Sequence, residues 1–246
     1  MITTTGIAFL IASFGFGFCA FRFFNAFQKI GGLRSGSRIG VLLSVFFIGL
    51  AFHSLVLAIG GLFFANIPDA LYALVTIDHL ILGVDTALGV YLGFYVLFPR
   101  FSPWPATILT LIFGLLVTWF TITTHPLPHI VEGRSIDLGL SQWLNTYLYY
   151  LLLLNIAVPF LIFTKNLFYA KTRDVKTISI IIVILTIIGL INVSIKFTAL
   201  LSHITSFQTY ISDILLGVLG LLFIAAFLFF PIIAGWTSRR SLEERQ

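Results

Sequence analysis

Seven long apolar runs, separated by short polar segments, make up most of the 246 residues of this chain. A helix crosses the hydrocarbon core of a bilayer with about 20 apolar residues. The runs predict spanning helices at about 5–27, 39–65, 71–98, 105–124, 142–168, 177–200 and 210–236. Only 9% of the residues are charged, whereas soluble domains carry roughly a quarter. We therefore expect an all-α, polytopic integral membrane protein: a seven-transmembrane-helix bundle, multi-pass in a cell membrane, with residues 1–246 forming a single membrane domain.

The basic residues predict the orientation of this bundle. Most of the 14 Lys and Arg side chains lie in the connections after the first, third and fifth spans and in the C-terminal tail. These residues are Lys29, Arg34, Arg38, Arg100, Lys165, Lys171, Arg173, Lys176, Arg239, Arg240 and Arg245. The opposite connections hold Arg134 alone. Because cytoplasmic loops carry an excess of Lys and Arg, we expect the N-terminus outside and the C-terminus in the cytoplasm.

Composition and motifs exclude several classes of protein. The single cysteine, Cys19, excludes an intrachain disulfide and any CxxC site. The basic residues form short clusters between apolar runs, so no surface could follow the phosphates of a nucleic acid. The chain has no Walker loop, HExxH helix or GxSxG elbow. We therefore assign no catalytic residue and expect a non-enzymatic protein.

We also expect no cofactor and assign no metal. Retinal would need a lysine in the middle of the last helix, whereas Lys196 lies near the end of the sixth span. Haem b needs two imidazoles that face one iron, but His53 and His79 are expected at heights that differ by about one helical turn. A group of metal-binding residue types in the fourth connection has a spacing that is common by chance. It consists of His125, His129, Glu132 and Asp137.

Polar side chains inside the predicted spans are the candidates for function, because such groups are costly in a bilayer and usually face the bundle interior. With turns centred near residues 68 and 205, a rise of 1.5 Å per residue predicts which residues are level. We expect His53 to lie beside Asp85 near mid-bilayer, and Lys196 to pair with Asp213 near the outer surface. The candidate ligand-binding or proton-relay residues are His53, Asp78, His79, Asp85, Asn155, Asn192, Lys196 and Asp213.

Small residues predict where helices pack closely. Gly89 and Gly93 form such a pair in the third span, and Gly217 and Gly220 form another in the seventh. Together with the basic cytoplasmic loops, these faces predict a protein partner or a homo-oligomer in addition to membrane lipid. The fourth connection, about 125–141, is long enough to cap the mouth of the bundle.

Two hypotheses on function follow. The first is a receptor-like, sensory or complex-forming subunit with a polar pocket in the outer half of the bundle. The second is a proton- or cation-translocating protein that uses Asp78, Asp85 and His53 as a relay. The inner half is nearly all apolar, which favours a pocket open to one side, and hence the first hypothesis. The layout is similar to the membrane sensor regions that precede bacterial signalling domains. Since about ten residues follow the last span, such a role implies output through a partner protein.

Overall fold

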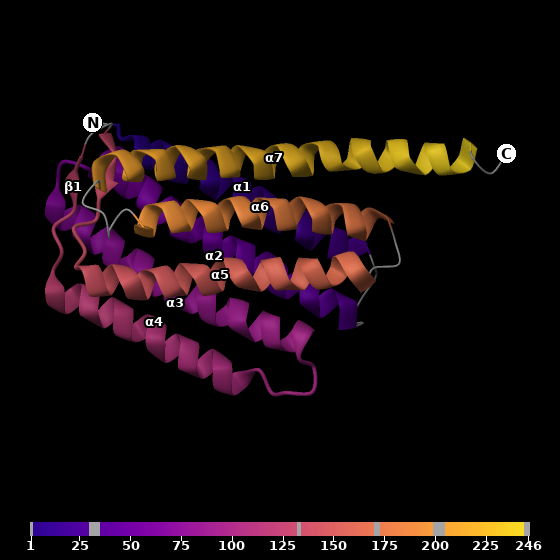
Figure 1. Ribbon diagram of the computed structural model, residues 1–246, viewed down its shortest axis with the longest axis horizontal. Helices are drawn as coiled ribbons and strands as arrows, with labels where there is room; N and C mark the ends of the chain where they lie inside the picture. Colours follow the sequence, from indigo (N-terminus) through magenta and orange to yellow (C-terminus); the bar gives the residue numbers. More distant parts are fainter. Residues whose placement is uncertain (1, 30–34, 132–133, 170–172, 199–204, 244–246) are drawn as a thin grey trace.

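The computed structural model of this chain is a bundle of seven long helices with one small β-hairpin (Figure 1). The helices are α1 (Thr4–Lys29), α2 (Ser35–Phe63), α3 (Pro68–Leu97), α4 (Trp104–Thr124), α5 (Gln142–Tyr169), α6 (Arg173–Thr198) and α7 (Thr205–Glu243). The antiparallel hairpin consists of β1 (His129–Ile130) and β2 (Ile136–Asp137). The structure describes residues 2–29, 35–131, 134–169, 173–198 and 205–243.

All seven helices are long and apolar enough to cross a membrane. The shortest, α4, has 21 residues, which corresponds to about 30 Å at 1.5 Å per residue. The expected all-α class and the number of apolar helices are therefore confirmed. Four helices begin three to five residues earlier than expected: α2 at Ser35, α3 at Pro68, α6 at Arg173 and α7 at Thr205. A proline is well tolerated at the first helical position, because the N–H that it lacks would have no partner within the helix.

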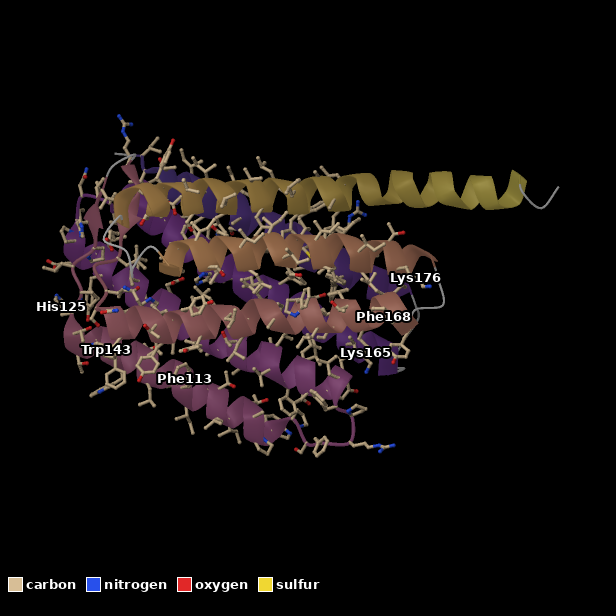
Figure 2. The ribbon with its side chains drawn as sticks, in the orientation of Figure 1. Phe113, His125, Trp143, Lys165, Phe168 and Lys176 are labelled. Carbon is tan, nitrogen blue, oxygen red and sulfur yellow. The ribbon has the colours of Figure 1, made fainter. Side chains whose placement is uncertain are left out.

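The connections gather at two opposite ends of the bundle (Figure 1). One end, which we call the hairpin end, carries the N-terminus, the α2–α3 turn and the β-hairpin. The other, which we call the basic end, carries the α3–α4 connection and the C-terminal part of α7, which extends beyond the other helices. Figure 2 shows Lys165 and Lys176 at the basic end and His125 and Trp143 at the hairpin end. The two classes of connection counted in the sequence therefore lie at different ends of the molecule.

Six of the helices enclose the interior, and α4 lies outside them. Around the bundle the order is α1, α2, α3, α5, α6 and α7, and α7 packs back on α1. Helix α4 packs mainly on α3, where Gly83 and Gly114 bring the two backbones together. On α7, a Cβ added to Gly220 would lie 2.8 Å from the backbone of Ala12 in α1. The expected close packing of the glycine face of α7 is confirmed.

Buried phenylalanine side chains fill the bundle interior on the side of the basic end. One core cluster contains seven of them, and six of these, excluding Phe16, form what we call the aromatic plug: Phe23, Phe46, Phe47, Phe163, Phe223 and Phe227. The rings of Phe23 and Phe47 are stacked with their centroids 5.5 Å apart, and the Phe47 and Phe223 centroids are 6.2 Å apart. Packed rings of this kind make this part of the interior apolar, so they offer water molecules no hydrogen-bonding partner.

Gly89 and Gly93 of α3 make space for side chains of the neighbouring helices and not for a close contact between helix backbones. A Cβ added to Gly89 would lie 2.9 Å from the ring of Phe46 in α2. A Cβ added to Gly93 would lie 3.4 Å from Val158 in α5. The pair therefore makes space for the aromatic plug and for an aliphatic contact with α5, instead of the expected close approach of another helix.

Candidate ligand-binding cavity

Two adjoining cavities lie inside the ring of six helices. The polar cavity has a volume of about 120 Å³ and is lined by Asp78, His79, Lys196 and Asp213, among others. The central cavity has a volume of about 110 Å³ and reaches the aromatic plug at Phe47. The residues that line both are Phe9, His53, Leu152, Asn192, Val193 and Leu216. Because an apolar cavity of about 150 Å³ can bind benzene, each has the size to hold part of a small organic molecule.

His53 of α2 contacts Asp78 of α3. Its Nδ1 lies 2.6 Å from Oδ1 of Asp78, and both side chains are buried. The expected position of His53 beside Asp85 is therefore wrong. Since α2 ends at residue 63 and α3 begins at residue 68, the turn is centred between them, earlier than the expected residue 68. This shift makes His53 level with Asp78.

Asp85 lies deeper in α3 and is held by α2 and α5. Its Oδ2 accepts a hydrogen bond from Nδ2 of Asn155 at 3.2 Å, and the same amide donates to Oγ1 of Thr86 at 3.2 Å. On α2, a Cβ added to Gly49 would overlap the carboxyl group of Asp85. The structure thus brings together Asp85 and Asn155, two of the residues singled out in the sequence.

Lys196 and Asp213 line the same cavity but do not form the expected ion pair. Oδ2 of Asp213 accepts a hydrogen bond from Oγ1 of Thr5 at 2.5 Å. Nζ of Lys196 lies 5.8 Å from the centroid of the Phe9 ring, and no carboxylate of the described residues lies within 4.0 Å of it. Helix α7 begins at Thr205, which makes Lys196 level with about residue 207 and places Asp213 roughly 9 Å deeper.

His79 is directed toward α4. Its Nδ1 lies 2.7 Å from Oγ1 of Thr121, and that hydroxyl donates to the carbonyl oxygen of Val117 at 3.0 Å. Because a hydroxyl has only one hydrogen, Thr121 accepts from His79, and Nδ1 carries the proton of the neutral ring. His79 therefore ties α3 to α4 while its side chain also lines the polar cavity.

The described part of the fourth connection caps the polar cavity. Leu138 and Leu140 line that cavity from the hairpin end. The hydroxyl of Thr5 accepts a hydrogen bond from the backbone N–H of Ile136 at 2.8 Å while it donates to Asp213. The expected cap is therefore confirmed, and this bridge, which we call the Thr5 latch, fastens it to α1 and α7.

The histidines of the fourth connection do not assemble a metal site in the described structure. Glu132 lies outside the described residues. Within the described ranges, no three His, Cys, Asp or Glu side chains lie close enough together to hold a metal ion. The ring of His125 instead packs on that of Tyr72, with the centroids 4.0 Å apart.

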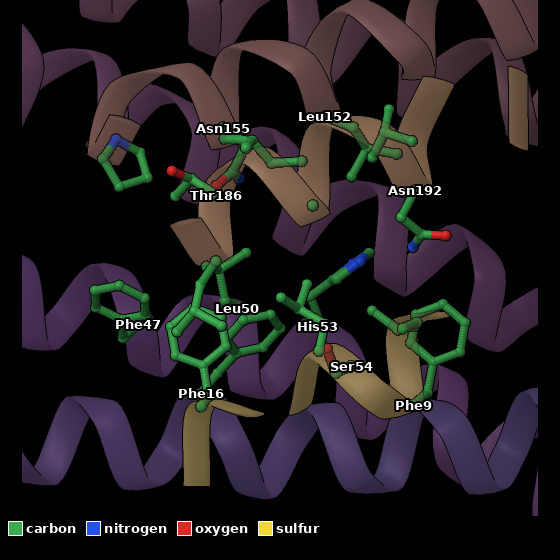
Figure 3. Close-up of a pocket in the computed structure, with 18 residues that line it drawn as sticks. Phe9, Phe16, Phe47, Leu50, His53, Ser54, Leu152, Asn155, Thr186 and Asn192 are labelled. Atoms are coloured by element: carbon green, nitrogen blue, oxygen red, sulfur yellow. The ribbon is translucent and has the colours of Figure 1, made fainter. Parts of the chain in front are cut away.

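Figure 3 shows the central cavity. The side chains of His53 and Asn192 project into it from opposite walls, and Asn155 and Thr186 line the α5–α6 side. Phe16 and Phe47 lie at the end of the central cavity that is away from Asn192. The buried Oδ1 atoms of Asn155 and Asn192 accept no hydrogen bond from the described residues. The central cavity is thus mainly apolar, with a few amide, imidazole and hydroxyl groups on its walls.

Sequence reasoning missed Thr5 and Gly49, which position the carboxylates. Thr5 is the first residue of the first predicted span and resembles the polar residues that often start a helix. Gly49 is a single glycine within a long apolar run. Neither carries a charge, and their roles depend on contacts with residues far away in the sequence. Asp213, the partner of Thr5, is 208 positions away.

Comparisons with protein-family models, with curated proteins and with solved structures give no match for this chain. The case for function therefore rests on the geometry of the cavities and on the charges that line them.

Proposed function

We propose that this chain is a non-enzymatic, multi-pass membrane protein that binds a small ligand in the polar and central cavities. It would act as a receptor-like or sensory protein, or as a subunit of a membrane complex. The main support is the position of the two cavities: Leu138 and Leu140 of the fourth connection line the polar cavity, and Phe47 and Phe223 of the aromatic plug line the central cavity. A cavity inside the bundle with mainly apolar walls and a few polar groups is suited to binding, because it can bury most of the surface of a small molecule.

Filling the central cavity tests this proposal. Gly189 of α6 lines that cavity, and a Cβ added there would lie 3.7 Å from its nearest neighbours, an ordinary contact distance. We expect Gly189→Phe to weaken saturable binding of decan-1-ol by at least about tenfold, because the new ring occupies the cavity. Gly189→Ala, which adds only the tolerated Cβ, should bind decan-1-ol within about threefold of the parent. Titration of the purified protein in lipid nanodiscs, followed by its thermal midpoint, provides the measurement. Equal binding by all three proteins would contradict the proposal.

We also propose that the hairpin end lies outside the membrane and the basic end in the cytoplasm, on the strength of the Lys and Arg asymmetry. Cys19 is buried, so the native thiol provides a low background. An impermeant maleimide added to intact cells should label Gly133→Cys and leave Ser241→Cys unlabelled until the cells are opened. The opposite pattern would reverse the orientation. Basic side chains on the cytoplasmic side would then be available to anionic lipid, a partner protein or a second copy of the chain.

The alternative function is proton or cation translocation through Asp78, Asp85 and His53. It is favoured by one observation, the 2.6 Å contact between buried imidazole and carboxylate groups. The aromatic plug opposes it, because a relay needs water or polar groups over its whole length. Proton uptake into liposomes by the parent protein that is lost in Asp85→Asn would favour translocation. The asparagine keeps the size of the side chain and can still accept from Asn155.

A further inference from the structure

We propose that the ligand is a linear amphiphile with an anionic head, of the medium-chain carboxylate class. Its carboxylate would bind Lys196 in the polar cavity, and its hydrocarbon chain would lie in the central cavity. This inference rests on the proposed ligand-binding function and adds the chemical class of the ligand to it.

The shape of the two cavities indicates an elongated molecule. They share lining residues on α1, α2, α5, α6 and α7, so they follow one another along the bundle axis. On α6 the lining runs from Lys196 to Leu185, which corresponds to about 16 Å at 1.5 Å per residue. The charged groups lie at the hairpin end of this path, whereas Phe16, Leu219 and Phe223 line the deep end. An amphiphile with its head at the cap and its tail at the plug matches this division.

The charges of the polar cavity indicate the sign of the head group. Asp78 lies 2.6 Å from the imidazole of His53, and Asp213 accepts the hydrogen bond of Thr5. Lys196 has no carboxylate within 4.0 Å among the described residues. Residues 197–208, which follow it in the chain, contain no Asp or Glu. Each of these two carboxylates therefore has a close contact, whereas among the described residues no carboxylate lies within 4.0 Å of the half-buried ammonium group. An anionic head group would supply a counter-ion at that distance.

Head-group comparison in the parent protein tests this inference directly. The probes are decanoic acid, decan-1-ol and decylamine, which share one chain length and differ in the charge of the head. We expect decanoic acid to bind about 10- to 100-fold more tightly than decan-1-ol at pH 8, as for a charge-assisted hydrogen bond, and decylamine to bind most weakly. Nanodiscs of uncharged phosphatidylcholine keep the lipid surface from attracting or repelling the probes.

Substitution of the lysine adds a second measurement. Lys196→Met should lower the affinity for decanoic acid to that for decan-1-ol and leave decan-1-ol binding within about threefold of the parent. Lys196→Arg should retain the preference for the acid, because the guanidinium group also binds carboxylates. Lys176→Met, at an exposed lysine of the basic end, is the matched control and should behave as the parent.

The outcomes separate this inference from the proposed function. If decanoic acid and decan-1-ol bind equally, and both are lost in Gly189→Phe, the anionic head is wrong and the ligand pocket stands. If decylamine binds best, the acidic side chains set the preference and the inference is overturned. If no probe shows saturable binding to the parent protein, the proposed pocket fails and the inference fails with it.

Discussion

Replacing Phe47 with alanine should destabilise the bundle by about 3 kcal/mol or more, the usual cost of removing a buried aromatic ring. Phe47 is 2% exposed and contacts the rings of Phe23, Phe46 and Phe223. Its loss would leave a void at the point where the central cavity meets the aromatic plug. The thermal midpoint of the purified protein in detergent measures the effect, provided that unfolding is reversible.

Phe52→Ala is the matched control for this variant. Phe52 belongs to the same helix as Phe47, but 57% of its surface is exposed on the outside of the bundle. We expect a change within about 0.5 kcal/mol, as for surface substitutions that leave the core intact. Equal destabilisation by the two alanine variants would show that the aromatic plug does not hold the helices together.

Adding a single methyl group at Gly49 should cost about 1–3 kcal/mol, the range found when a packed core is overfilled. The new Cβ would overlap the carboxyl group of Asp85, whose short side chain also accepts from Asn155. Movement of Asp85 away from α2 would therefore weaken that hydrogen bond as well. Thermal unfolding of Gly49→Ala beside the parent protein gives the cost.

Gly17→Ala provides the control for the glycine substitution. A Cβ added to Gly17 of α1 would meet its nearest neighbour at 3.9 Å, so the methyl group fits. Alanine is also favoured over glycine within a helix by about 1 kcal/mol, and this variant should equal or exceed the parent in stability. If the clash with Asp85 is the cause, Asp85→Ala should relieve part of the Gly49→Ala penalty in the double variant. If the stability changes of Gly49→Ala and Asp85→Ala simply add in the double variant, the cost of Gly49→Ala comes from a contact other than that with Asp85.

The helices themselves could be predicted from the sequence because the signal is long and continuous. A run such as that of α6 is apolar over more than twenty residues, and an error of two or three residues at either end leaves a spanning helix recognisable. The inward-facing polar residues were also identifiable. Asp78, Asp85 and Asp213 are buried in the structure, as expected for ionisable groups within such helices.

The pairing of these residues could not be predicted with the same accuracy, because partners across a hairpin depend on where the turn is centred. When the centre of the turn moves by one residue along the chain, the residue at the same height on the opposite helix changes by two positions. The end of α2 at Phe63 and the start of α3 at Pro68 together make His53 level with Asp78 instead of Asp85. The early start of α7 likewise separated Lys196 from Asp213. Element ends are the least certain part of any sequence-based prediction, and here the site is most sensitive to them.

Contacts made by uncharged residues could not be predicted from the sequence. The Thr5 latch joins the first helix, the fourth connection and the last helix, which are separated by most of the chain. Nothing in the local pattern around Thr5 or Ile136 distinguishes them from other threonines and isoleucines. Such contacts follow from the way the whole bundle packs, so only the folded structure identifies them.

The contact between α1 and α7 closes the ring of helices with the first and last spans of the chain. Without α7, the ring of helices would have an open side, and the cavity walls that Asp213, Leu216 and Leu219 form would be missing. During synthesis from the N-terminus, the pocket would come into existence in a single step, when the seventh helix docks. An assembly order of this kind would make the two cavities depend on completion of the last helix.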